Sequence, residues 1–274
     1  GGIFIFTVTY SYITYDGDVT YQRLANKGLN EAPTSFTFLQ VYAPVILLIL
    51  TRLRMPVSTS ILLLSAFSTR ATSIIDILEK SFFGYFLAFI TAIVVWLAMT
   101  RLYDKYKKTK LAPYWMPLQW VTSGFLWSVW IMQDAANVAV VLPRSLELGQ
   151  FLFFTAFIFI GLGLLFYLKG DKIQSIVNEK SEVTDVRAAT LVDFIYAILL
   201  YYLKWVSTIP ISTTWVFIGL LGGRELAINI ISKTGMDRKR GIIDSLLLIR
   251  KDVVYAAIGL IVSMILALSI NAEM

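Results

Sequence analysis

The 274-residue sequence contains no cysteine and no histidine. Without cysteine there are no disulfides or thiolate metal sites, and without histidine there are no imidazole bases, histidine proton relays or histidine-ligated haem. Charged residues make up only 15% of the chain. Any chemistry therefore depends on carboxylates, hydroxyls, amides, lysine, arginine or the backbone, and we expect no cofactor.

Apolar residues, in contrast, are abundant. They form 57% of the sequence, and the mean hydropathy is +0.72. A soluble globule needs more polar surface than this, so the composition is typical of a polytopic membrane protein. The net charge of +6 then indicates basic loops beside a lipid bilayer, and no nucleic-acid partner is expected.

Several apolar runs have the roughly 17–25 residues that a membrane helix needs. Residues 1–14 resemble the end of one such span, and complete spans lie near 36–53, 82–100, 114–133, 151–168, 190–208 and 253–271. Two further segments, 57–78 and 211–231, begin with hydroxyl residues and contain small or polar interruptions, so we expect broken or re-entrant half-helices there. The predicted fold class is an all-α polytopic membrane protein.

The charge of the loops predicts their sidedness, because Lys and Arg gather in short cytoplasmic loops. Residues 101–113 carry five bases against one acid, and residues 233–252 carry six against three. We expect both loops to be cytoplasmic and the more acidic loop 15–33 to lie outside. The predicted location is the cell (inner) membrane, with multiple passes.

A short motif occurs twice. The sequence PVSTS at 56–60 recurs as PISTT at 210–214, and an arginine follows each copy at the same spacing, Arg70 and Arg224. Each pair is separated by 154 residues. The repetition predicts a chain built from two related halves.

The two halves are predicted to be inverted relative to each other. Threading the chain through the basic loops sends the spans 36–53 and 190–208 in opposite directions. We therefore expect inverted-topology repeats at 1–110 and 111–274, an architecture in which transporters bind substrate near the midplane.

The first repeat is predicted to be incomplete at its N-terminus. With the same offset, the counterpart of 114–133 falls before residue 1, and the sequence begins without Met. We expect the natural chain to carry about 40 more residues, with one further span and an Asp or Asn analogous to Asp134.

The repeated motif predicts an anion site. A helix that begins inside a membrane exposes unpaired amide N–H groups and a positive dipole end, which attract anions. Proline in the first turn and a hydroxyl at the cap suit such a start. The candidate residues are Ser58, Thr59, Ser60, Ser212, Thr213 and Thr214. The alternative is that these hydroxyls only bind backbone groups and neighbouring helices.

A second candidate site is the pair Asp134 and Asn137. Three residues apart, they share one helix face and are predicted to coordinate a cation, Na⁺ or a proton. An acid at the bilayer centre costs about 2.5–3.5 kcal/mol, which favours a functional role. The alternative places Asp134 at the outer interface, where its charge is inexpensive.

Arg70 and Arg224 are candidate counter-charges for the anion. Twelve helical residues span about 18 Å, so they reach the helix starts only if the chain turns at Ser68–Thr69 and at Gly222–Gly223. The alternative is that both arginines extend to the membrane interface.

These motifs resemble those of the inorganic phosphate transporter family, of which the chain would be a distant relative. The family's repeats carry a G-A-N-D-V-A-N type motif, similar to QDAAN at 133–137, and a P-[VI]-S-T-[TS]-H type motif, similar to PVSTS and PISTT. Gln133, Trp215 and Ile61 depart from these patterns, and the first half contains no N-D-x-x-N.

The resemblance implies a secondary transporter that moves phosphate, or sulfate in some relatives, together with Na⁺ or protons. It implies that Asp134 and Asn137 bind the ion and phosphate, and that the hydroxyl residues of both motifs hold the anion.

Two other classes remain as alternatives. An anion channel would share the hydrophobicity. An intramembrane aspartyl protease could use Asp134 and Asp193, but its G-x-G-D and P-A-L motifs are absent, so we expect no enzyme. The sequence leaves open whether the chain forms a homo-oligomer.

Overall fold

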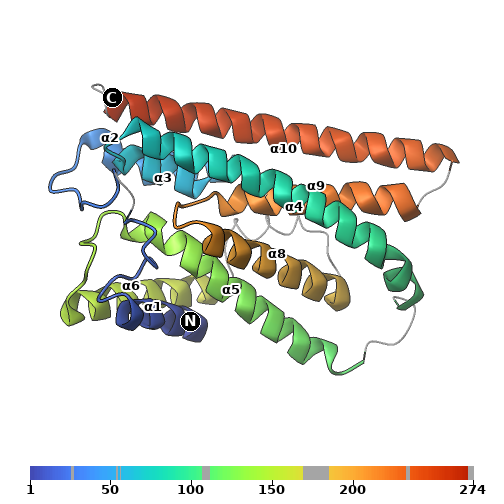
Figure 1. Ribbon diagram of the computed structural model, residues 1–274, viewed down its shortest axis with the longest axis horizontal. Helices are drawn as coiled ribbons and strands as arrows, with labels where there is room; N and C mark the ends of the chain where they lie inside the picture. The colour runs from blue at the N-terminus through green and yellow to red at the C-terminus, as the bar shows by residue number, and fades with distance from the viewer. Residues whose placement is uncertain are drawn as a thin grey trace.

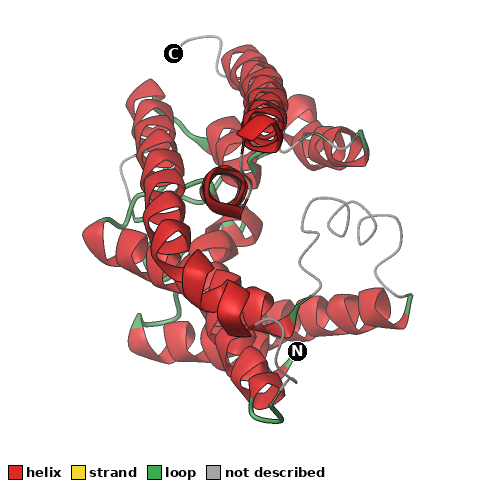
Figure 2. Cartoon of the chain, turned by 90° about the vertical axis from the view of Figure 1, so that its right-hand side faces the viewer, coloured by secondary structure: helices red, strands yellow, loops and turns green. Residues whose placement is uncertain are grey.

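The computed structural model describes residues 1–25, 28–53, 55, 57–106, 112–168, 185–232 and 235–270. This part of the chain folds into helices and contains no strand (Figure 2), which confirms the predicted all-α class. The helices are α1 (Gly2–Thr14), α2 (Phe38–Arg52), α3 (Thr59–Phe67), α4 (Ala71–Tyr106), α5 (Trp115–Ala139), α6 (Leu148–Tyr167), α8 (Val186–Val206), α9 (Thr213–Ser232) and α10 (Gly235–Ile270).

Five described helices, α4, α6, α8, α9 and α10, are long and apolar enough to cross a membrane. They are consistent with the predicted multi-pass membrane protein. The 25-residue helix α5 is not in this group, although a span was predicted at 114–133. Its polar side chains Gln119, Gln133, Asp134 and Asn137 lower its hydropathy, and the first three of them form hydrogen bonds to α8 or α9.

The long helices run between two ends of the molecule (Figure 1). We call the end with residues 15–37, 68–70 and 140–147 the loop end, on the left in Figure 1. The opposite end, where α9 meets α10, is the far end. Helices α4 and α9 run from the loop end towards the far end, and α8 and α10 run back.

The two halves of the chain pack against each other through pairs of helices. Helix α4 makes its most extensive contact with α9, and α3 packs along α10. The α4–α9 contact depends on glycine: a Cβ atom added at Gly219 would lie 2.4 Å from the Tyr85 carbonyl oxygen, and one at Gly223 would lie 2.3 Å from that of Phe89. Small residues thus allow close backbone approach, as is common between membrane helices.

The two segments that were predicted to be broken differ. In the first, α3 ends at Phe67 and residues 68–70 separate it from α4. In the second, α9 continues from Thr213 to Ser232 without a turn at Gly222–Gly223. The glycines there lie against neighbouring helices, and α9 continues through them. Pro56, at the start of the first motif, lies outside the described residues.

Residues 15–25 and 28–37 fold back into the bundle at the loop end. The Tyr21 hydroxyl donates to the Thr7 carbonyl oxygen at 2.6 Å, and burial raises the pKa of Tyr21 above its ordinary value. Arg144 holds the other side of this segment, with Nε donating to the Leu29 carbonyl oxygen at 2.9 Å and Nη2 to that of Glu31 at 2.7 Å. The loop is therefore anchored from two sides, and it brings a residue from its middle into the interior.

Candidate functional site

The start of α9 lies inside the bundle and is capped by its own hydroxyl. Ser212, only 1% exposed, accepts a hydrogen bond from the Trp215 amide on its Oγ at 3.2 Å. Its own amide donates to Ser81 Oγ of α4 at 2.9 Å. The predicted cap therefore exists, and it satisfies one of the amides that a helix start leaves without a partner.

Asp134 joins α5 to this helix start. Thr213 Oγ1 donates to Asp134 Oδ2 at 2.9 Å, and Asn137 Nδ2 donates to Asp134 Oδ1 at 2.9 Å. Asn137 is 3% exposed, and its Oδ1 atom has no hydrogen-bond partner. The structure thus brings together three predicted site residues from both halves of the site, the acid pair and the second hydroxyl motif.

Arg23 brings a positive charge to the same region. This side chain is completely buried, and Nη1 donates to the carbonyl oxygens of Ser207 at 3.2 Å and Ile209 at 2.8 Å. Nη2 donates to Gln133 Oε1. Burial lowers the pKa of Arg23, and the charge of Asp134 acts in the opposite sense.

Gln133 and Tyr196 complete the arrangement. Gln133 Nε2 donates to the Leu200 carbonyl oxygen of α8 at 2.9 Å, and the Tyr196 hydroxyl donates to the Thr213 carbonyl oxygen at 2.8 Å. Side chains from α5, α8, α9 and the loop therefore meet around Asp134. The site combines one acid, one base, an amide with a free acceptor and a helix start.

The start of α3 has a similar cap but a separate position. Ser58 Oγ accepts from the Ile61 amide at 3.1 Å, and the buried Ser60 Oγ has no hydrogen-bond partner. Within the described residues, no hydrogen bond connects this cap with Asp134 or Thr213. Instead, the buried side chains of Ile61, Trp215 and Ala136 pack in one apolar cluster between the two helix starts.

The remaining predicted residues lie at the edge of these groups or away from them. Thr59 and Thr214 are half-buried in the first turns of α3 and α9. Arg70 is exposed at the loop end, beyond the C-terminus of α3. Arg224 pairs with Glu225 at 2.5 Å and lies over the Trp96 ring at 5.9 Å. Neither arginine is brought to the start of α3 or of α9.

Asp193 belongs to a different polar cluster. Its Oδ2 accepts from Ser123 Oγ and from Gln119 Nε2 at 2.9 Å. Ser123 and Asp134 are 11 residues apart on α5, a distance of about 16 Å along a helix. The two acids that an aspartyl protease would need to place side by side are therefore held at different levels of the bundle.

Nothing in the local sequence indicates that Arg23, Gln133, Ser81 and Tyr196 contribute to this site. In the sequence, Arg23 is one of the charges of loop 15–33, and Gln133 is a departure from a motif. One available signal was the position of Gln133 directly before Asp134, since a second polar side chain at that depth needs a partner.

The described residues contain no group of three or more Asp, Glu, His or Cys that could hold a metal. A weakly held cation has other ligands available here, because the two Asp134 oxygens and the free Asn137 Oδ1 are oxygen acceptors of the kind that hard cations select. The comparisons with known proteins add no family: no protein-family model, no curated protein and no solved structure matches this chain.

Proposed function

We propose that the protein is a secondary active transporter of a small inorganic oxyanion, with phosphate as the first candidate, coupled to Na⁺ or H⁺. The observation that carries this proposal is the contact between Asp134 and Thr213 at a buried helix start. An acid that binds a cation and a helix start that attracts an anion are there one hydrogen bond apart.

The helix boundaries support an inverted repeat. Helices α2 and α8 end at residues 52 and 206, and α3 and α9 begin at residues 59 and 213, so both pairs are 154 residues apart. The paired helices run in opposite directions: α3 ends at the loop end, where Thr69 N donates to the Gly28 carbonyl oxygen at 3.0 Å, whereas α9 leads away from it (Figure 1). Interrupted helices in matching positions of inverted repeats are a transporter arrangement.

Electrostatics suggests how the two ions would be coupled. A carboxylate beside the start of α9 repels an anion, by about 4 kcal/mol for two unit charges 4 Å apart at an effective dielectric constant of 20. A proton or Na⁺ on Asp134 removes that repulsion. Asn137 Oδ1 supplies another acceptor for the cation, while Ser212, Thr213 and the positive charge of Arg23 favour the anion. Cation binding would therefore precede anion binding.

The sidedness of the protein remains part of the proposal. The far end carries the junction of α9 and α10 and the end of α4, so the first residues of both basic segments meet there. The predicted loops were drawn too long, because residues 101–106 belong to α4 and residues 235–252 belong to α10. Residues 107–111 and 233–234 of these loops lie outside the described residues. We assign the far end to the cytoplasm, following the excess of Lys and Arg.

Uptake into proteoliposomes tests the function. The purified protein should accumulate labelled phosphate when a Na⁺ gradient or a proton gradient is imposed, each applied separately. Sulfate uptake in place of phosphate would reassign the substrate within the same architecture. Uptake that does not saturate and ignores both gradients would identify an anion channel, and the absence of any uptake by folded protein would reject the proposal.

A further inference from the structure

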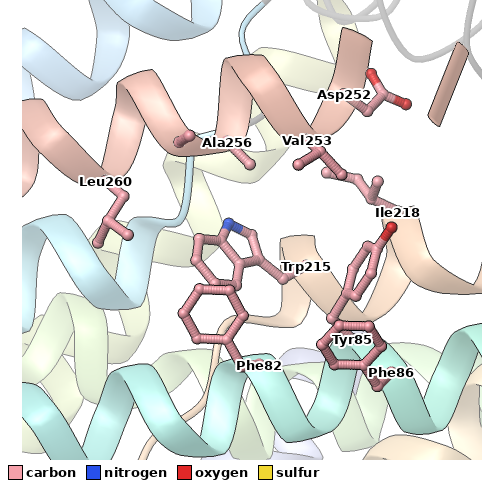
Figure 3. Close-up of a pocket in the computed structure, with 10 residues that line it drawn as sticks. Phe82, Tyr85, Phe86, Trp215, Ile218, Asp252, Val253, Ala256 and Leu260 are labelled. Atoms are coloured by element: carbon pink, nitrogen blue, oxygen red, sulfur yellow. The ribbon is translucent and has the colours of Figure 1, made fainter. Parts of the chain in front are cut away.

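Two cavities adjoin α9 and the segment that leads into it. The larger one, of about 270 Å³, lies between α4, α9 and α10, and Figure 3 shows Phe82 and Trp215 among its mostly apolar lining. Of the described residues that line it, Asp252 alone is charged. Such a lining offers hydrated ions few polar partners. The second cavity, of about 230 Å³, lies at the loop end and has a different lining.

The loop-end cavity is polar. Thr72, Ser73 and Asp76, from the first two turns of α4, line one side, and Ile209 and Pro210 line another. Thr72 and Asp76 are exposed, so the cavity has an open mouth. A polar cavity of this size has room for several water molecules, whereas apolar cavities stay dry. The lining therefore favours a water-filled cavity.

One face of α4 leads from this cavity to the start of α9. Ser73, Ile77 and Ser81 follow each other at intervals of four residues, so they share that face. The first two line the cavity, and Ser81 Oγ accepts a hydrogen bond from the Ser212 amide at 2.9 Å. From Ile77 to Ser81 is about 6 Å along the helix. The cavity therefore ends about one helical turn from the cap of α9.

An apolar cluster connects this cavity with the candidate site. Leu29 and Ile77 line the cavity and belong to the cluster that also contains Ala136 and Trp215. Ala136 is two residues from Asp134, and Trp215 is two residues from Thr213. These apolar side chains separate the water-filled cavity from the acid, so the structure corresponds to a closed entrance.

The mouth of the cavity carries one charge of each sign. Asp76 lines the cavity, and the exposed Arg70 precedes the first residue of α4. Arg70 and Ser73 both lie against Gly28, where an added Cβ atom would be 3.1 Å from Arg70 Cβ and 2.7 Å from Ser73 Oγ. Charges at an entrance raise the local concentration of ions of opposite sign, and salt screens the effect.

We propose that the loop-end cavity is the vestibule through which both ions enter the site, with Asp76 attracting the cation and Arg70 the anion. The inference rests on the transport function proposed above and adds the route and two residues that recruit the ions. A shared vestibule means that the cation and the anion enter from the same side of the membrane. Ile77 and Leu29 then form the gate that must move before the ions reach Asp134.

Cysteine labelling tests the vestibule directly, because the chain contains no cysteine and a single substitution introduces the only thiol. Thiosulfonates react with the thiolate, which apolar burial suppresses. Ser73→Cys places the thiol in the cavity, and Ser65→Cys on α3 is the matched control, since the two serines are 6% and 0% exposed but only Ser73 lines the cavity. In purified protein, we expect Ser73→Cys to react at least tenfold faster than Ser65→Cys.

Two charge substitutions in the Ser73→Cys protein test the recruitment of ions. Asp76→Asn should slow a cationic thiosulfonate about threefold, the effect of a unit charge about 6 Å away in water, and should not slow an anionic one. Arg70→Gln should slow the anionic reagent instead. Both effects should shrink at high salt. Asp16→Asn removes an exposed acid of the loop end outside the cavity lining and should change neither rate.

The vestibule is rejected if Ser73→Cys reacts as slowly as Ser65→Cys, and the recruiting charges are rejected if Asp76→Asn and Arg70→Gln act like Asp16→Asn. Uptake into proteoliposomes tests the route. A bulky thiosulfonate adduct at Ser73→Cys should block uptake, whereas the same adduct at the exposed Ser35→Cys should not. Unchanged uptake by fully labelled Ser73→Cys protein would show that the ions take another route. Absence of uptake by the unlabelled protein would instead reject the transport function, so the two failures are distinguishable.

Discussion

Arg23 and Gln133 are hydrogen-bonded inside the bundle although 110 residues separate them in the sequence. The contact ties the loop that follows α1 to the middle of the molecule and places a positive charge next to the residue that precedes Asp134. It makes Arg23 the fixed counter-charge of the candidate site, a position for which Arg70 and Arg224 had been predicted.

Arg23→Gln should lower the thermal stability of the protein strongly. The substitution removes the donor to three buried oxygen atoms, and leaving a buried acceptor without a partner typically costs about 1–3 kcal/mol. The measurement is the melting temperature of the detergent-solubilised protein, followed by size-exclusion chromatography after heating.

Arg23→Gln should change the affinities for the two ions in opposite directions. With the positive charge gone, the cation should bind more tightly to Asp134 and the anion more weakly. Arg144→Gln is the control, because Arg144 also donates to loop carbonyl oxygens, but those of Leu29 and Glu31 and not those beside Asp134. Equal shifts of both ion affinities in the two variants would contradict a role for the Arg23 charge.

Asp134→Asn should preserve folding and abolish cation-driven uptake. The amide keeps the shape of the side chain and loses the charge that a coupling cation requires. Uptake of labelled anion should therefore no longer respond to either gradient, while the elution profile stays unchanged. Uptake with wild-type ion dependence would remove Asp134 from the coupling mechanism.

Thr213 and Ser212 should give different phenotypes, since one hydroxyl contacts the acid and the other caps the helix. Thr213→Val removes the hydrogen bond to Asp134 and should reduce anion affinity about tenfold, the equivalent of 1.4 kcal/mol. Thr213→Ser keeps the hydroxyl and should retain uptake. Ser212→Ala removes the cap of the Trp215 amide and should cost about 1 kcal/mol of stability.

A combined Ser212→Ala and Thr213→Ala protein that is folded and binds the anion with unchanged affinity would refute the anion site.

Gly223→Ala should disturb assembly, because its added methyl group would meet the Phe89 carbonyl oxygen at 2.3 Å. Overpacking of this kind costs about 1–3 kcal/mol. Gly163→Ala on α6 is the matched control, since nothing lies within 4 Å of an added Cβ there. The two variants are compared by the yield of monodisperse protein and by its melting temperature. Equal values would show that α4 and α9 can move apart without loss of stability.

The helix starts could be predicted because capping is a local property. A hydroxyl at position i and the amide at i+3 are close whenever a helix begins there, so Ser58 and Ser212 were recognisable from a few residues. The Asp134–Asn137 contact is also local, at a separation of three on one helix. Such features need no knowledge of the tertiary fold.

Arg23 and the glycines of α9 depend on contacts that the local sequence does not contain. The residues next to a loop arginine do not indicate whether its side chain faces water or enters the bundle. Gly222–Gly223 was equally compatible with a turn and with a close helix contact, and only the position of Phe89 on α4 distinguishes the two. Tertiary packing therefore decided the residues that the sequence left ambiguous.

The contact between α4 and α9 also restricts how the molecule can change shape. Helix α4 comes from residues 1–110 and α9 from residues 111–274, yet their backbones touch at Gly219 and Gly223. Separating two backbones in such contact would leave close-packed surfaces without partners, so in the transporter proposed above the two halves of the chain would not rock apart as separate blocks. Opening of the site would instead displace smaller pieces around this contact.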